Sequence, residues 1–267
     1  MKHITPQTES KLFEYLRYRP IIDHGASRML FAADETVKEI LGLDQNMNCV
    51  IKVAIGLGGM KQNNAEADMF SNYGDSDFLA KIYLIGRYTI VMEEVDPDDY
   101  RDMADEIGSN WEDDFDYYCD YEEIEKDDPN YATLKEAAKL IGFLADKQGC
   151  TADNGQIGSR ADGKLVAYDY GYSIDFSTDS QTSRISDCMD DGEDRLHYLE
   201  GLMNILNQEG WLMSEVDRLL HRLECSIAGD DEYYEEDDEE NCTDEKDTAY
   251  WEREDTFDEE EDYTCSD

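Results

Sequence analysis

A change in hydrophobic period constrains the fold of this chain more than any other sequence feature. Up to about residue 95, short alternating apolar runs predict strands at 19–24, 28–33, 49–55, 79–85 and 88–95. Helices are predicted at 6–17 and, between the later strands, at 61–72. These elements together predict an antiparallel sheet with one inserted helix.

From Tyr131 the apolar spacing becomes helical. Leu134, Leu140 and Leu144 fall on one face of a helix that is predicted to run to Gly149. Two short strands flank the turn Ala161-Asp162-Gly163. Two more helices are expected at about 191–207 and 212–226, so the fold class is α+β.

Charge is concentrated in two segments. The chain has 267 residues and a formal net charge of −44, which argues against nucleic acid or an anionic membrane as a direct partner. Segments 96–128 and 230–267 hold 37 of the 67 acidic residues and four of the 23 basic ones. The first segment mixes carboxylates with aromatics and is predicted to form short helices. The second lacks apolar periodicity and is expected to be a disordered tail.

Cysteine use and hydropathy indicate a compartment. The seven cysteines are odd in number and never form a C-x-x-C pair, so neither a disulfide framework nor a zinc site is expected. No window approaches the roughly 20 apolar residues of a membrane span, and the N-terminus has no apolar signal segment. A reducing cytoplasm is therefore the expected location.

Four short motifs follow one another along the chain, and their order indicates a fold. They are the strand Cys49-Val50-Ile51-Lys52-Val53-Ala54, the helix segment Gln62-Asn63-Asn64-Ala65-Glu66, the strand end Met92-Glu93-Glu94-Val95, and Asp169-Tyr170-Gly171 behind a β-turn. Their order resembles the protein-kinase fold, particularly the small, divergent kinase-like proteins of bacteriophages. The resemblance covers about 19–175.

The resemblance implies roles for these residues. Lys52 is similar to the kinase lysine that reaches the ATP phosphates, and Glu66 to the glutamate that pairs with it. Asp169 corresponds to the aspartate that holds Mg²⁺. Glu93 and Val95 stand at the hinge, whose backbone groups hydrogen-bond adenine. The implied cofactors are ATP and Mg²⁺.

Two loops depart from the kinase pattern. The glycine-rich loop is reduced to His24-Gly25-Ala26-Ser27-Arg28, in which Gly25 and Ser27 are the candidate phosphate contacts. Counting back from Asp169 places Thr151 and Gln156 where kinases have the base and a metal-binding asparagine.

Threonine is no base at neutral pH, and glutamine is a methylene longer than asparagine. A shifted loop would let Asn154 bind metal and Asp153 or Asp146 act as base. Catalysis is therefore expected to be impaired.

Each candidate has a simpler interpretation. Lys52 could be an edge lysine that snorkels to solvent, Glu66 a solvated helix residue, and Asp169 a turn cap. The resemblance predicts a two-lobed fold with a truncated C-lobe. Its parts are a kinase-like N-lobe at 1–95, an acidic aromatic insert at 96–130, a reduced helical C-lobe at 131–229 and an acidic tail at 230–267.

Three functional hypotheses follow. The first is a kinase-like nucleotide-binding protein, or pseudokinase, that acts by binding a basic host or phage protein. The second is an active Ser/Thr protein kinase that uses ATP and Mg²⁺. The third is a DNA mimic whose acidic segments occupy the basic channel of a host nucleic-acid enzyme. For a phage protein, the location would be the host cytoplasm.

Overall fold

The fold is mixed α and β, as the sequence predicted. The computed structural model describes residues 1–25, 27–98, 100–148, 156–171, 188–189, 191–208 and 210–229. The predicted acidic tail at 230–267 lies outside these ranges, as does the loop that carries Thr151, Asp153 and Asn154.

Two sheets organise the strands. The larger has six strands in the order β1-β5-β6-β4-β3-β2. All its pairs are antiparallel except that of β1 with β5. The smaller sheet has the order β7-β8-β9. The strands are β1 (Lys2–His3), β2 (Asp23–His24), β3 (Arg28–Ala32), β4 (Cys49–Ala54), β5 (Ile82–Ile85), β6 (Thr89–Glu93), β7 (Asp96–Pro97), β8 (Ile157–Ser159) and β9 (Leu165–Ala167).

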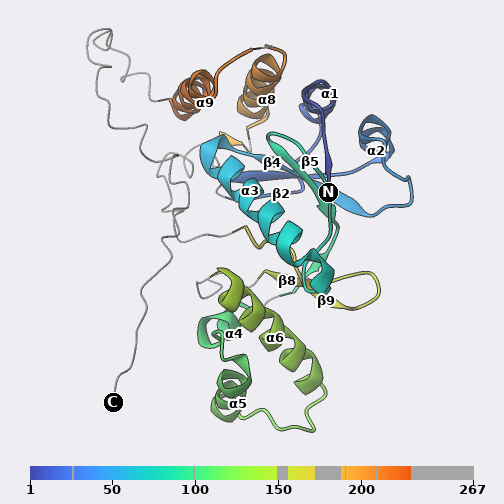
Figure 1. Cartoon of the computed structure of the whole chain (residues 1–267), viewed down its shortest axis with the longest axis vertical. Helices are drawn as coiled ribbons and strands as arrows, with labels where there is room; N and C mark the ends of the chain where they lie inside the picture. Colours follow the sequence, from blue (N-terminus) through green and yellow to red (C-terminus); the bar gives the residue numbers. More distant parts are fainter. Residues whose placement is uncertain are drawn as a thin grey trace, which may run out of the picture. The chain divides into compact units, whose positions relative to one another are not determined.

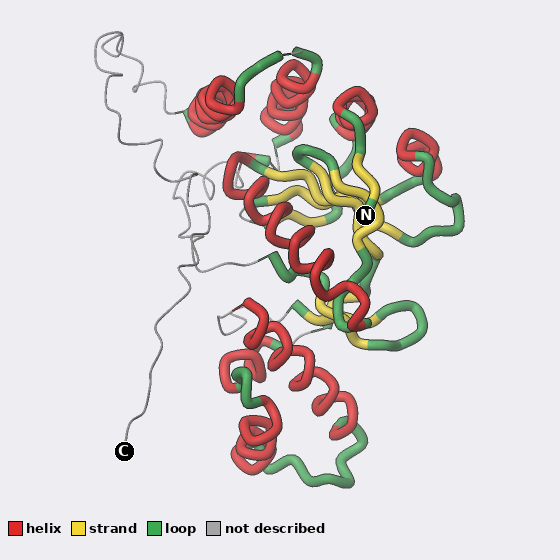
Figure 2. Tube along the Cα trace, in the orientation of Figure 1, coloured by secondary structure: helices red, strands yellow, loops and turns green. Residues whose placement is uncertain are grey.

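Helices cover both faces of the larger sheet. Figures 1 and 2 show α1, α2 and α8 on one side of it and α3 on the other. The helices are α1 (Pro6–Leu16), α2 (Glu35–Leu41), α3 (Gly56–Tyr73), α4 (Arg101–Glu106), α5 (Trp111–Tyr121), α6 (Tyr131–Gln148), α8 (Gly192–Leu206) and α9 (Met213–Ala228).

A first hydrophobic core forms on the face of the sheet opposite α3. Every second residue of these strands faces this core: Met29 and Phe31 on β3, and Ile51 and Val53 on β4. They pack with buried residues of α1, α8 and α9 (Leu12, Phe13, Leu16, Tyr198, Leu199, Leu202, Val216 and Leu220). This core fixes β3 and β4, the strands that carry the candidate site.

A second core joins α3 to the smaller sheet and α4–α6. Ile90 and Met92 on the other face of β6 contact it, together with Val166 on β9 and Tyr170. The acidic segment contributes Phe115 from α5, which packs against α6 as the predicted aromatic side of a short helix.

The last two helices differ from the predicted division into lobes. The sequence grouped 131–229 as one helical lobe, but α8 and α9 belong to the first core, with α1 and the sheet, whereas α6 belongs to the second. The physical reason is that the sheet face opposite α3 is apolar, and α1 covers only part of it. Helical periodicity reveals that α8 and α9 have an apolar stripe, but not which surface the stripe meets.

Several element boundaries also differ. Helix α3 begins at Gly56, five residues before the predicted start, because Gly59 lets the helix approach its neighbours: a Cβ there would lie 2.2 Å from the Ser27 carbonyl oxygen. Helix α2 was not predicted, although Asp34 caps its start and Gly42 ends it in the left-handed conformation. The strand predicted at 19–24 is reduced to β2.

Among the residues that the structure describes, no helix is both long and apolar enough to cross a membrane.

Candidate functional site

Lys52 lies in β4, between β3 and β6 in the larger sheet. Its cross-strand neighbours are Leu30 and Ile90. The residue is only 6% exposed. A buried ammonium group must find partners inside the protein, which is inconsistent with an edge lysine that snorkels to solvent.

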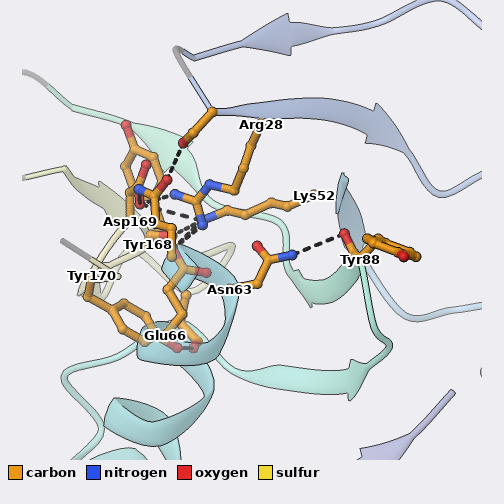
Figure 3. A network of polar contacts seen from close by, with 11 residues as sticks. Arg28, Lys52, Asn63, Glu66, Tyr88, Tyr168, Asp169 and Tyr170 are labelled. Atoms are coloured by element: carbon orange, nitrogen blue, oxygen red, sulfur yellow. Dashed lines mark hydrogen bonds and ion pairs between the residues drawn. The ribbon is translucent and has the colours of Figure 1, made fainter. Parts of the chain in front are cut away.

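Glu66 and Asp169 both lie close to this ammonium group. Lys52 Nζ donates a hydrogen bond to Glu66 Oε1 at 2.8 Å and another to the carbonyl oxygen of Tyr168 at 2.7 Å (Figure 3). It also lies 3.9 Å from Asp169 Oδ1. The structure thus brings together three candidate residues from β4, α3 and the segment that follows β9. Glu66 is fully buried and is not a solvated helix residue.

The segment Asp169-Tyr170-Gly171 is held against α3 and the second core. The Tyr170 hydroxyl donates to the carbonyl oxygen of Ala80 at 2.9 Å, and this side chain is 1% exposed. A Cβ on Gly171 would come within 2.5 Å of the Gln62 carbonyl oxygen and 2.6 Å of Glu66 Cγ. Glycine therefore permits the close approach that places Asp169 beside Lys52.

Arg28 completes the group, and the sequence analysis gave it no role. It begins β3 opposite Ala54, on the same face of the sheet as Lys52. Arg28 Nη1 lies 2.7 Å from Glu66 Oε1, and Nη2 donates a short hydrogen bond to Asp169 Oδ1 (Figure 3). The position of Arg28, two residues before the partner of Lys52 on the neighbouring strand, is the sequence signal that could have revealed it. We call Arg28, Lys52, Glu66 and Asp169 the charge cluster.

The charge cluster contains two cations and two carboxyl groups, and the pKa values of the two carboxyl groups shift in opposite directions. Burial raises the pKa of Glu66, and the charges of Arg28 and Lys52 only partly offset this effect. Burial also opposes ionisation of Asp169, but there the same two cations prevail and hold its pKa well below 3.8. Asp169 has a side chain 23% exposed, whereas that of Glu66 is 0% exposed. Asp169 is therefore ionised, and it is the carboxyl group of the charge cluster that contacts solvent.

The turn between β2 and β3 is fastened to the start of α3. Gly25 N–H donates to the Arg28 carbonyl oxygen at 3.0 Å and closes the turn. The Ser27 carbonyl oxygen accepts from Ile55 N–H at 2.7 Å, and the Ser27 hydroxyl donates to the side chain of Gln62. Gly25 and Ser27 therefore border the charge cluster.

The two hinge candidates have hydrogen-bond and packing partners outside the charge cluster. The Glu93 carboxylate accepts from Arg160 Nε at 2.9 Å and from Lys81 N–H at 3.1 Å. Glu93 N–H donates to the Lys81 carbonyl oxygen, and the Val95 side chain packs on the second core. None of these hydrogen-bond partners is a member of the charge cluster.

The remaining candidates are residues of the expected catalytic loop and Asp146, which lies in α6. The Gln156 carbonyl oxygen accepts from Tyr168 N–H at 3.0 Å, so Gln156 lies next to the strand end that binds Lys52. Asp146 forms an exposed ion pair with Lys147 at 2.7 Å. Asp153 and Asn154 lie outside the described residues.

Asp169, the described carboxylate expected to bind Mg²⁺, already has cations as partners. Three or more carboxylate, histidine or cysteine side chains that could share a metal are not found together in the described part of the chain. Asp169 is already bound by Arg28, and Glu66 is paired with both cations. A divalent cation at Asp169 would face two positive side chains, which oppose its binding.

Comparisons with protein-family models, curated proteins and solved structures found no match to this chain.

Proposed function

We propose that this chain is a kinase-like nucleotide-binding protein, impaired in phosphotransfer, that acts by binding a basic protein surface. The observation that carries the proposal is the meeting of Lys52, Glu66 and Asp169 within 3.9 Å of the Lys52 amine. In protein kinases a strand lysine pairs with a helix glutamate, and both act with the aspartate of the D-F-G segment. Lys52 and Glu66 are 14 residues apart, while Lys52 and Tyr168, which precedes Asp169, are 116 apart.

The order of elements gives further support. The lysine strand β4 is followed by α3, which carries Glu66, and then by the antiparallel pair β5 and β6. The strand that leads to Asp169 follows α6 and belongs to the separate small sheet. A kinase-like two-lobed fold would have this order, with the nucleotide between Lys52 and the hinge at Glu93–Val95.

Each residue would have a distinct part in binding. Lys52 would contact a nucleotide phosphate, and Glu66 would keep its ammonium group in place. Gly25 and Ser27 would border the phosphates from the β2–β3 turn. The backbone around Val95 would receive the base.

The test is calorimetric titration of ATP into the full chain at physiological salt, where repulsion by the acidic residues is screened. We expect binding by the wild type and at least about tenfold weaker binding by Lys52→Met, since a charge-assisted hydrogen bond is lost. Lys164→Met is the matched control, because Lys164 pairs with Asp77 on the surface. Equal affinity of the two variants, or no binding by the wild type, would refute the proposal.

Impaired phosphotransfer rests on Thr151 and Gln156 at the expected positions of the base and the metal ligand. Assays with radiolabelled ATP and a casein-like substrate should give no transfer above background. Transfer that Asp169→Ala abolishes would favour an active Ser/Thr protein kinase instead.

Binding to a basic partner is supported by the outer face of α5. Tyr117 and Tyr121, four residues apart, are 67% and 72% exposed among the acidic residues of this helix. Exposed aromatic rings surrounded by carboxylates offer anchoring as well as long-range attraction to a basic surface. If the partner is a host nucleic-acid enzyme, Tyr117→Ala with Tyr121→Ala should weaken capture of that enzyme, and DNA should compete with the wild type. If neither the two substitutions nor added DNA reduces capture of the enzyme, DNA mimicry through α5 is excluded.

A further inference from the structure

We propose that Arg28 takes the place of a divalent cation beside Asp169, so that this site binds the phosphates of a nucleoside di- or triphosphate without Mg²⁺. The inference rests on the proposed nucleotide binding and deepens it. It concerns the residue that departs most from the kinase pattern, since an arginine stands where the phosphate-covering loop of a kinase is rich in glycine.

The first argument is the position of the guanidinium group. Arg28 is 6% exposed and contacts both carboxyl groups of the charge cluster, Glu66 through Nη1 and Asp169 through Nη2 (Figure 3). Gln62 Nε2 also donates to Asp169 Oδ1, at 3.4 Å. The aspartate expected to hold a metal thus already has a cation and an amide donor.

The second argument is that one buried donor of the charge cluster, Arg28 Nη1, is held by an ion pair without a well-formed hydrogen bond. Arg28 Nη1 lies 2.7 Å from Glu66 Oε1, but this ion pair lacks the geometry of a hydrogen bond. Buried polar atoms without hydrogen bonds are costly, and a guanidinium group matches the oxygens of a phosphate. A phosphate oxygen beside Arg28 and Lys52 would accept the hydrogen bond from Nη1 that the ion pair with Glu66 does not form.

The third argument is that the backbone holds Arg28 in place before any ligand arrives. Arg28 pairs with Ala54 in the sheet, and its carbonyl oxygen accepts from Gly25 N–H. The adjacent Ser27 is bound to Ile55 and Gln62. A cation fixed in this way needs no recruitment from solvent, so the role of a metal in neutralising phosphate charge is already filled.

The test is titration of ATP into the full chain, once with excess EDTA and once with excess Mg²⁺. The wild type should bind with affinities that agree within about threefold, a small difference on the scale of a charge-assisted contact. In Arg28→Gln, Asp169 loses the nearer of its two cations and keeps Lys52 at 3.9 Å. This variant should bind at least about tenfold more weakly in EDTA and recover affinity in Mg²⁺. Lys164→Gln removes one surface charge and should behave as the wild type, which controls for metal bound by the acidic segments.

The outcomes separate the two proposals. Wild-type binding in Mg²⁺ alone would overturn the inference and leave nucleotide binding intact, whereas absence of binding in both buffers would remove both. Arg28→Gln that binds equally well in EDTA and Mg²⁺ would also overturn the inference. If Arg28→Gln does not fold, Arg28→Lys decides the matter, because it keeps the charge and should remain independent of Mg²⁺; a metal requirement in this variant would contradict the account.

Discussion

Two glutamates, Glu9 and Glu66, are equally buried but are held in different ways. Both are 0% exposed, and burial raises the pKa of each. Glu9, on α1, accepts hydrogen bonds from the backbone N–H groups of Arg87 at 3.0 Å and Tyr88 at 2.8 Å. Glu66 is held instead by the side chains of Lys52 and Arg28.

The difference separates a carboxylate held by the backbone from one held by side chains, for which we propose a part in nucleotide binding. The backbone donors around Glu9 belong to the β5–β6 turn and cannot move without unfolding it. A Cβ on Gly86 would lie 2.4 Å from Glu9 Oε1, so the turn closes tightly over the carboxylate. The partners of Glu66 are long side chains beside the partly exposed Asp169, and such side chains can change partners when a ligand enters.

Removal of Glu66 should have the largest effect on stability. Glu66→Ala leaves Lys52 and Arg28 buried with Asp169 alone, and loss of one partner from a buried ionic group costs about 3–5 kcal/mol. Urea denaturation of the full chain measures this loss. A loss below about 1 kcal/mol, typical of surface pairs, would mean that the charge cluster is solvated.

Glu9→Gln should cost less, because the side chain keeps its shape and loses one acceptor. We expect a loss of about 1–3 kcal/mol, the cost of leaving one buried N–H donor without an acceptor. ATP binding by this variant should equal that of the wild type, since Glu9 lies in the first core. Weaker ATP binding by folded Glu9→Gln would show that the two glutamates are not independent.

Two glycine substitutions should separate close packing from backbone strain. Gly171→Ala forces a Cβ against Gln62 and should cost about 1–3 kcal/mol and weaken ATP binding. Gly163 has φ +82° and open space around it, so Gly163→Ala should cost about 1–2 kcal/mol through strain and leave ATP binding unchanged. If both variants bind ATP as the wild type does, the contact between Gly171 and α3 does not position Asp169.

Much of the fold could be predicted from local pattern. The strands β3 and β4 and the helices α1, α6, α8 and α9 lie close to their predicted ranges, because alternation and helical spacing are properties of neighbouring residues. The packing partner of α8 and α9 could not be predicted, since an apolar stripe fits either face of the sheet. The early start of α3 depends on the contact between Gly59 and Ser27, which are distant in sequence.

The site residues that belong to sequence motifs could be predicted. The residue whose position depends on strand pairing could not. Lys52, Glu66 and Asp169 were found by their motifs, and the structure brings them together. Arg28 was missed because its importance comes from its place on β3 beside β4, and strand register is a tertiary property.

The pH dependence of stability should give the smallest effect. It distinguishes Glu9 from Asp169 because their pKa values shift in opposite directions. The pKa of Glu9 is raised, so its contribution to stability is present below its unfolded pKa, near 4.5, and is lost as pH rises through the folded pKa. The pKa of Asp169 is lowered, so its contribution is present above about 3.8 and is lost on acidification through the folded pKa.

Urea denaturation from acidic to neutral pH checks these signs. The stability advantage of the wild type over Glu9→Gln should decrease as pH rises above 4.5. Its advantage over Asp169→Asn should decrease as pH falls below 3.8. Two differences with the same sign of slope would contradict the assigned environments.

The central claim, that the charge cluster is a nucleotide site, is tested most directly by an acyl-phosphate derivative of ATP. An amine held at the phosphates attacks the acyl carbon, forms an amide and releases ATP, so mass spectrometry identifies the lysine that contacts the nucleotide. The account predicts that Lys52 in the full chain is acylated in preference to the surface residue Lys164, and that excess ATP suppresses the reaction at Lys52 alone. Labelling of Lys52 no greater than that of Lys164, or labelling that excess ATP leaves unchanged, would contradict the claim.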